Sequence, residues 1–228
     1  MRLKNQGFTL TELLIVIAIV AIMATIALPN MSDWIASRRT ASRAEHIVNL
    51  LRFARSEAVR LNVPVYVCPV AIRKDGNPDR YCDADQAGEG LAAFADNNKD
   101  GSYSREDDTN LRTVILNMKD QERVSYQFET YDFNYDKTGN NKVWGFLPNG
   151  MFGHAESAGD KLSMASGFVK ISLTDSAAQN ERTKKSRSRI VWLDSSGRVN
   201  ECSGNSTAND TDNNNNVAAM LCEYKTAE

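Results

Sequence analysis

The sequence predicts an α+β fold in which one long N-terminal helix packs on an antiparallel β-sheet domain. Helix-compatible residues extend from Phe8 to Asn62, which corresponds to a helix about 80 Å long at 1.5 Å per residue. Pro64 stops this helix. Short runs rich in Val, Ile, Tyr, Phe and Trp then alternate with turn residues, as in β-strands. Because no helical pattern separates these runs, we expect antiparallel pairing.

The chain begins with a basic leader, residues 1–7, which precedes an apolar segment, residues 8–29. The apolar run from Phe8 to Leu28 has about the 20 residues that a helix needs to cross a bilayer. Arg2 and Lys4 predict a cytoplasmic N-terminus and an exported remainder. The leader is too short for a conventional secretory signal, and no small-x-small cleavage site follows the apolar run. A plain signal anchor is the simplest alternative.

Glu12 argues against a plain anchor. A carboxylate within an apolar span costs about 3 kcal/mol on insertion scales, so such a residue is normally paired and functional. Cleavage after Gly7 would give Phe8 a free amine four residues before Glu12. A charge pair between this amine on one subunit and Glu12 on its neighbour would neutralise both groups. It would also set the axial register of two packed helices.

Pro29 ends the apolar run, and it predicts a kink or a helix break at the membrane surface. Residues 30–62 are amphipathic, with apolar residues at spacings of three and four that predict a face packed on the C-terminal domain. His46 is expected to be a surface residue of this helix. Arginines occupy the other directions: Arg38, Arg39, Arg43, Arg52, Arg55 and Arg60. They form a solvated face, meet acids of neighbouring subunits, or contact lipid phosphates near the membrane.

Residues 63–228 are expected to form a β-rich exported domain. Turn signals such as Asp100-Gly101 and Ser196-Gly197 separate its strands. The expected strands are Val65–Val70, Leu91–Ala95, Leu111–Leu116, Val124–Phe128, Val143–Leu147, Phe168–Thr174 and Arg189–Leu193. Residues 203–216 are polar and of low complexity, so they are prone to disorder.

The four cysteines form two sequence-local pairs, Cys68 with Cys82 and Cys202 with Cys222. An even number of cysteines in an exported domain predicts disulfides. Three pairings are formally open, and we favour the two local ones. The spacing does not match a metal site, which only His46 and His154 could complete.

A polar segment after the second expected strand partly matches an EF-hand calcium loop. Asp96, Asn98 and Asp100 supply oxygens at alternate positions before Gly101, and Asp107 replaces the bidentate glutamate. The alternative is a polar hairpin loop, in which Asp, Asn and Gly are favoured for their turn geometry. Calcium is the one metal ion that the sequence suggests, and no cofactor is expected.

An enzymatic function is not expected. His154 lies in a glycine-containing stretch, residues 151–154, without a partner at motif spacing. We therefore expect a loop residue there.

The net charge of −2 removes any global electrostatic argument for nucleic-acid binding.

The N-terminus resembles the class III prepilin signal of type IV pilins and type II secretion pseudopilins. The resemblance rests on residues 7–12, Gly-Phe-Thr-Leu-Thr-Glu, on the basic leader and on the apolar span ending at Pro29. It implies cleavage between Gly7 and Phe8 by a prepilin peptidase, N-methylation of Phe8, and a role for Glu12 in assembly. In this family the helix can melt locally near Pro29 during assembly.

The body of the chain resembles the GspH/FimT group of minor pilins and pseudopilins. The matching motifs are residues 49–60, 94–101 with Leu111-Arg112, 146–150 and 190–199. The resemblance implies a minor pilin that primes or caps a type IV pilus. A type II secretion pseudopilin is the alternative. Implied partners are major and minor pilins, the inner membrane and its assembly platform, with a periplasmic domain that reaches the cell surface after assembly.

A basic run suggests a third function, a pilus-displayed DNA receptor for natural transformation. The run comprises Arg182, Lys184, Lys185, Arg187 and Arg189. Some FimT-like pilins bind DNA through basic residues near the C-terminus, and clustered cations support salt-dependent phosphate binding. The alternative is a solvated loop.

Overall fold

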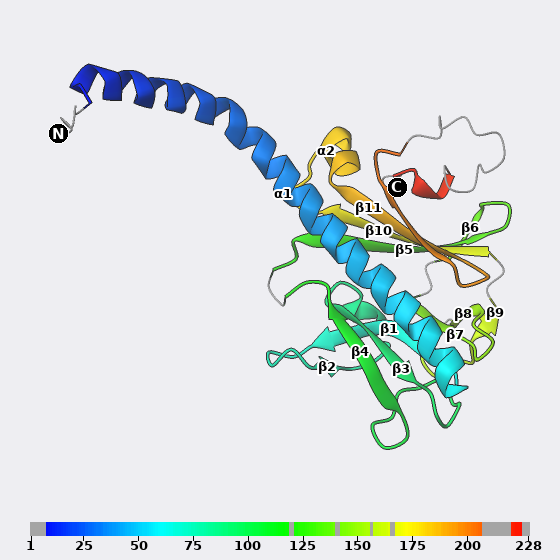
Figure 1. Cartoon of the computed structure of the whole chain (residues 1–228). Coiled ribbons are helices and arrows are strands. Elements are labelled where there is room, and N and C mark those ends of the chain that lie inside the picture. The colour runs from blue at the N-terminus through cyan, green and yellow to red at the C-terminus, as the bar shows by residue number, and fades with distance from the viewer. Residues whose placement is uncertain are drawn as a thin grey trace, which may run out of the picture.

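A single long helix and two antiparallel sheets make up the described chain (Figure 1). The computed structural model describes residues 8–118, 121–139, 142–155, 157–164, 167–206 and 220–224, without the side chains of residues 26–30 and 164. The leader, including Gly7, lies outside the described residues, as do residues 207–216 of the polar segment.

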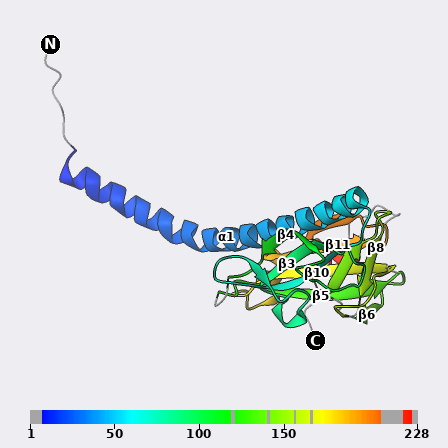
Figure 2. The same cartoon turned by 90° about the horizontal axis from the view of Figure 1, so that it is seen from below.

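Helix α1 extends from Leu10 to Leu61, 52 residues. Thr9 caps its N-terminus, and Asn62 ends it in a left-handed conformation with φ of 56°. The helix continues through Pro29, so a helix break at this position is wrong. Figures 1 and 2 show that α1 instead curves along its length. Curvature of this kind is common in long helices that follow a domain surface.

The domain contains two antiparallel sheets, which confirms the expected antiparallel pairing. The sequence analysis did not specify the number of sheets. The first has the order β4-β3-β1-β7-β8-β9 with β2 beside β1, and the second has the order β12-β11-β10-β5-β6. The bounds are β1 Val65–Ile72, β2 Pro78–Asp79, β3 Gly90–Ala95, β4 Thr109–Ile115, β5 Val124–Asp132, β6 Lys137–Gly139, β7 Val143–Phe146, β8 Phe152–Ala155, β9 Ser163–Met164, β10 Gly167–Asp175, β11 Ser188–Asp194 and β12 Val199–Ser203.

All seven expected strands are present, and β5 is four residues longer than expected. The sequence analysis missed β2, β6, β8, β9 and β12, the 3₁₀ turn η1 Ala84–Gln86, and the helix α2 Glu181–Ser186. Most of these elements are short, and each missed strand pairs with the strand before it in the chain. His154 lies on β8 opposite Trp144, so the expectation of a loop residue is wrong.

The hydrophobic core lies between α1 and both sheets. The helix contributes Ala44, Ile47, Leu51, Ala54 and Ala58, which are fully buried and have the spacing that the sequence predicts. The first sheet adds side chains such as Trp144 and Phe146, and the second adds side chains such as Ile171 and Val191. The apolar face of the helix therefore holds the two sheets together.

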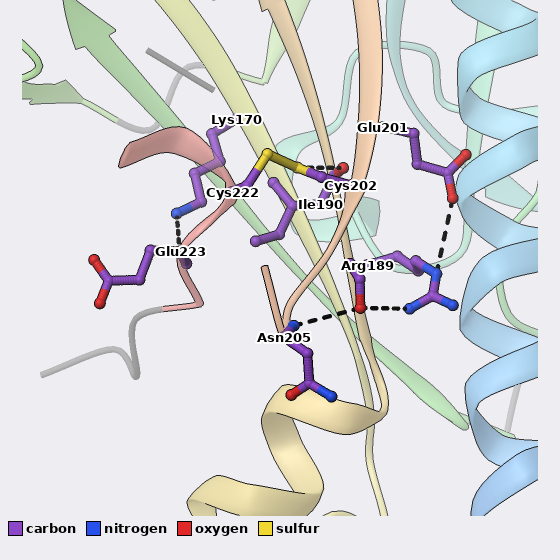
Figure 3. Close-up of a disulfide and its surroundings, with 9 residues drawn as sticks. Lys170, Arg189, Ile190, Glu201, Cys202, Asn205, Cys222 and Glu223 are labelled. Atoms are coloured by element: carbon purple, nitrogen blue, oxygen red, sulfur yellow. Dashed lines mark hydrogen bonds and ion pairs between the residues drawn. A yellow bond between two sulfur atoms is a disulfide. The ribbon is translucent and has the colours of Figure 1, made fainter. Parts of the chain in front are cut away.

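Both sequence-local cysteine pairs are disulfides. Cys68 on β1 is joined to Cys82, and Cys202 on β12 is joined to Cys222. Figure 3 shows the second bridge holding the C-terminal segment against the sheet, where Lys170 Nζ donates to the carbonyl oxygen of Glu223 at 2.8 Å. Lys170 is 2% exposed, so this contact satisfies a buried cation.

Candidate functional site: the free stem and the neck

The N-terminal half of α1 extends away from the domain (Figure 2). We call residues 8–35 the free stem. Its described side chains are exposed apart from the half-buried Ala24, and Phe8 is 91% exposed. Among the side chains of α1 that the structure describes, the first that is buried is that of Ala36. Soluble monomers rarely leave an apolar surface of this extent uncovered, so the free stem is a surface for packing against other molecules.

Within the residues whose placement the structure describes, no helical stretch meets the length and hydropathy expected of a membrane span.

Glu12 and Thr9 form a capping box at the start of the free stem. The backbone N–H and the hydroxyl of Thr9 both donate to Glu12 Oε2 at 2.8 Å. In return, the backbone N–H of Glu12 donates to Thr9 Oγ1 at 3.3 Å. The carboxylate is therefore held in the first turn, next to the residue that follows Phe8. The Thr-x-x-Glu pattern predicts this box, and the sequence analysis missed it.

An ionic network ties the last turn of the free stem and the following turn of α1 to the domain. We call its members, Asp33, Arg39, Asp175 and Arg187, the neck. Arg187 Nε donates to Asp33 Oδ1 at 3.0 Å, and its Nη1 lies 3.4 Å from Asp175 Oδ1. Arg39 Nη1 donates to the other oxygen of Asp175 at 3.1 Å. The hydrogen bond to Asp33 and the charges of both acids raise the pKa of the Arg187 guanidinium. The network fixes the point at which the stem leaves the domain.

Farther along α1, Arg55 joins the segments that resemble the GspH/FimT group. Its Nε donates to the carbonyl oxygen of Gly150 at 3.0 Å, and its two Nη atoms donate to those of Gly197 and Ser196 at 3.2 and 3.0 Å. A Cβ on Gly197 would lie 2.9 Å from the Gly150 oxygen, and the Gly197 φ of 77° also favours glycine. Arg55 therefore connects a turn from each sheet to the helix.

The basic run extends from α2 through its C-cap residue Arg187 to the start of β11, so most of it is not in a loop. Arg187 belongs to the neck, and Arg189 donates to Ser203 Oγ at 3.1 Å and lies 3.9 Å from Glu201. Arg182, Lys184 and Lys185 remain at least partly exposed on α2. The charge available for a nucleic acid is therefore smaller than the sequence suggests.

The segment with calcium-loop character is held by its own hydrogen bonds. The Asp96 carboxylate accepts the backbone N–H groups of Asp100 and Gly101 at 3.2 and 3.1 Å. Burial raises the pKa of Asp96, and the charge of Asp108 adds to this effect. Asp107 is exposed, and among the described residues its one contribution to the loop is a carbonyl oxygen that accepts from Asn97 Nδ2.

The second inward carboxylate of this loop is Asp108, which the sequence analysis missed. It accepts the backbone N–H groups of Asn97 and Ser104 at 3.0 and 2.8 Å. Among the described residues, no group of three or more His, Cys, Asp or Glu side chains is placed to hold a metal ion. The geometry of Asp96, Asn98 and Asp100 is that of a hydrogen-bonded turn.

The N-terminal half of α1 extends freely and begins with a capped acidic turn, while its C-terminal half packs on two antiparallel sheets. This arrangement defines a pilin-type subunit. Residues 2–28 match the prokaryotic N-terminal methylation motif. Residues 43–197 match the family of the type II transport protein GspH. The chain belongs to this family.

Solved structures with similarity to the chain include two minor subunits. The type IV minor pilin FimU of Pseudomonas aeruginosa is 15% identical, with a TM-score of 0.39, and the match covers 71% of this chain and 91% of FimU. The minor pseudopilin EpsH from the type 2 secretion system of Vibrio cholerae is 10% identical, with a TM-score of 0.41, and the match covers 73% of this chain and 98% of EpsH. No curated protein sequence matches the chain.

Proposed function

We propose that the chain is a minor pilin, a structural subunit that primes or caps a type IV pilus through packing of its N-terminal helix. The observation that carries this proposal is the free stem, whose described side chains form an exposed and largely apolar surface between Phe8 and Ile35. Inside the domain the same helix is almost fully covered along one face. The stem therefore needs a second apolar environment, first the inner membrane and then neighbouring helices.

The N-terminal residues supply the chemistry of assembly in this proposal. Removal of residues 1–7 leaves the amine of Phe8 at an exposed position beside the first turn of α1. The prepilin peptidase that cuts after Gly7 also methylates this amine. The hydrogen bonds of the capping box hold the Glu12 carboxylate at the end of the helix, where it can meet the amine of a neighbouring subunit.

In the membrane-inserted state the N-terminus is cytoplasmic and residues 63–228 are periplasmic. Residues 8–29 span the inner membrane before the assembly platform transfers the helix into the filament. Pro29 lacks the N–H that would continue the helix hydrogen bonds, which favours local melting during transfer. The partners are other major and minor pilins, which pack against the free stem.

Three variants test this proposal by separating charge from helix capping. Glu12→Gln keeps a side chain that can complete a capping box but removes the charge. Thr9→Ala removes the cap hydroxyl and keeps the charge, and Glu45→Ala removes an exposed acid elsewhere on α1. We expect Glu12→Gln to abolish incorporation into sheared filaments, whereas the other two variants assemble. Intact mass should show that the mature chain begins at a methylated Phe8.

Normal incorporation of Glu12→Gln, or retention of residues 1–7 in the assembled subunit, would contradict the proposal. Assembly defects of equal size in Glu12→Gln and Thr9→Ala would assign the effect to helix capping instead of charge pairing.

A second candidate is a pseudopilin of a type II secretion system, which the match to the GspH family favours. The helix packing would be the same, but the machine would differ. Deletion of the gene separates the two candidates, because loss of pili with normal secretion supports the pilus. Loss of secretion with normal pili supports the pseudopilin.

A further inference from the structure

The neck end of the domain carries exposed cations together with exposed apolar side chains. Trp34 is 59% exposed on α1, and Met118 is 65% exposed in the connection between β4 and β5. The guanidinium of Arg38 lies over the Trp34 ring, 5.5 Å from its centroid. We call Trp34, Arg38, Met118 and Arg123 the neck rim. Figure 1 shows α2 beside α1 at this same end, where the free stem joins the domain.

A small pocket of about 160 Å³ opens beside the rim. Three arginines line it: Arg39 and Arg43 on α1, and Arg123, which directly precedes β5. The remaining lining residues are Asn117, Met118, Gln121 and Val124, so no described lining residue is acidic. The pocket therefore combines guanidinium groups from two segments that are far apart in the sequence.

Most of the hydrogen-bond donors in this pocket are not used within the described chain. A guanidinium has five N–H donors. Arg39 uses one for Asp175, and Arg43 uses one for the carbonyl oxygen of Ile115 at 2.8 Å. Arg123 is exposed, and its side chain forms no hydrogen bond or ion pair among the described residues. Planar guanidinium groups match the oxygen geometry of both phosphate and carboxylate, so this site fits an anionic oxygen group such as a phosphate.

The position of the rim along α1 indicates where that phosphate comes from. If residues 8–29 span the membrane, Trp34 lies about 8 Å beyond the span and Arg39 about 15 Å beyond it. The polar layer of a bilayer is about 5–8 Å thick on each side. Helix side chains also lean toward the N-terminus, which brings the guanidinium groups nearer to this layer. Tryptophan is enriched at this level of membrane proteins.

We propose that the neck rim and its arginine pocket bind the phosphate of anionic phospholipid headgroups while the subunit waits in the membrane. This inference rests on the proposed function, because it needs the free stem to lie in a bilayer. Trp34 and Met118 enter the interface between headgroups and acyl chains, while Arg38 and Arg123 meet the phosphates. A nucleic acid or an acidic neighbouring subunit would match the cations but would leave the exposed Met118 without an apolar contact.

The experiment compares the full chain in nanodiscs of phosphatidylcholine alone with nanodiscs that also contain phosphatidylglycerol. Native mass spectrometry counts the lipids retained by the protein. Arg38→Gln and Arg123→Gln remove rim cations that form no ion pair among the described residues. Arg105→Gln and Arg198→Gln are the matched controls, because both are exposed arginines in turns outside the neck.

We expect the wild type and both controls to retain phosphatidylglycerol preferentially. Each rim variant should lower this preference about fivefold, because a cation near an anionic surface contributes about 1 kcal/mol. Inorganic phosphate at matched ionic strength should not abolish the preference of the wild type, because the lipid is also held by the bilayer.

Equal retention of both lipids by a chain that enters the nanodiscs would overturn the lipid inference and leave the proposed function intact. Failure to enter either nanodisc would contradict the proposed function itself. Rim variants that keep the lipid preference but lose filament incorporation would assign the rim to a neighbouring subunit. Full displacement of the lipid by inorganic phosphate would also overturn the inference, because the pocket would then be a site for free phosphate.

Discussion

Arg55 on α1 donates through Nε to the carbonyl oxygen of Gly150, 3.0 Å away in the turn between β7 and β8. The same side chain reaches the turn between β11 and β12 in the other sheet. One helix residue therefore links both sheets, because the turn from each sheet points backbone carbonyl oxygens at its guanidinium group. The contact explains why three separated motifs of the sequence belong together.

Arg55→Ala should destabilise the domain more than the loss of a neighbouring arginine. Hydrogen bonds from charged donors typically contribute about 1.5–3 kcal/mol each and are not additive, so we expect a net loss of about 2 kcal/mol in the free energy of unfolding. This corresponds to a melting temperature lower by roughly 4–8 °C. Arg52→Ala is the control, because Arg52 makes one long bond of 3.4 Å to Val199. Equal shifts for the two variants in thermal unfolding would contradict this role of Arg55.

The Cys202–Cys222 disulfide should stabilise the C-terminal segment locally. The double serine variant opens a loop of 20 residues that the disulfide closes. Loop-closure entropy predicts that this lowers the free energy of unfolding by about 3 kcal/mol. Hydrogen exchange should rise in β12 and in residues 220–224, where Lys170 would also lose its contact with Glu223. Removal of the Cys68–Cys82 bridge should instead raise exchange in β1. The same hydrogen-exchange pattern in both double variants would show that the two disulfides do not stabilise separate regions.

The free energy of unfolding should decrease in acid because Glu129 becomes protonated. Burial opposes ionisation of this carboxylate, but hydrogen bonds from Lys137 and Tyr131 and the charges of Lys137 and Lys170 lower its pKa below the ordinary 4.5. A lowered folded-state pKa contributes stability that is fully present above 4.5 and is lost as the pH falls through the folded-state value.

Denaturant titrations from about pH 7 to about pH 3 check this prediction. The wild type should lose more stability across this range than Glu129→Gln, which has no charge to lose. An equal loss in both proteins would show that other carboxylates account for the acid sensitivity.

Asp108 should matter more than Asp107 for the loop between β3 and β4. Asp108→Ala removes the acceptor of two backbone N–H groups, and such a loss costs about 2 kcal/mol. Asp107→Ala removes an exposed carboxylate and should change stability by less than about 0.5 kcal/mol. Chemical unfolding of both variants tests the order. A calcium-binding heat that Asp107→Ala abolishes and Asp108→Ala retains would instead support Asp107 as a calcium ligand.

The long helix and the seven main strands were predictable because their information is local. The spacing of Ala44, Ile47 and Leu51 records one buried helix face, and β-branched runs such as Val65–Val70 record buried strands. The methylation motif is equally local, because its residues are contiguous at the N-terminus. The Thr9–Glu12 capping box was also readable from the sequence, although the sequence analysis did not recognise it.

Short strands such as β9 were not predictable, because a two-residue strand depends on its partner rather than on its own composition. The division into two sheets has the same cause, since only long-range pairing determines which strands are neighbours.

The sequence by itself therefore determined the half-apolar helix, the acidic residue near its start and the positions of the main strands along the chain. Only the tertiary structure decided how the charged residues of the domain are used. Arg187 and Arg189 are sequence neighbours of exposed cations, yet the fold places them beside Asp33 and Glu201. Arg123 is conversely far in the chain from Arg39 and Arg43 on α1, yet the three arginines line one pocket. The physical reason is that electrostatic interactions depend on distance in space, which local sequence patterns do not specify.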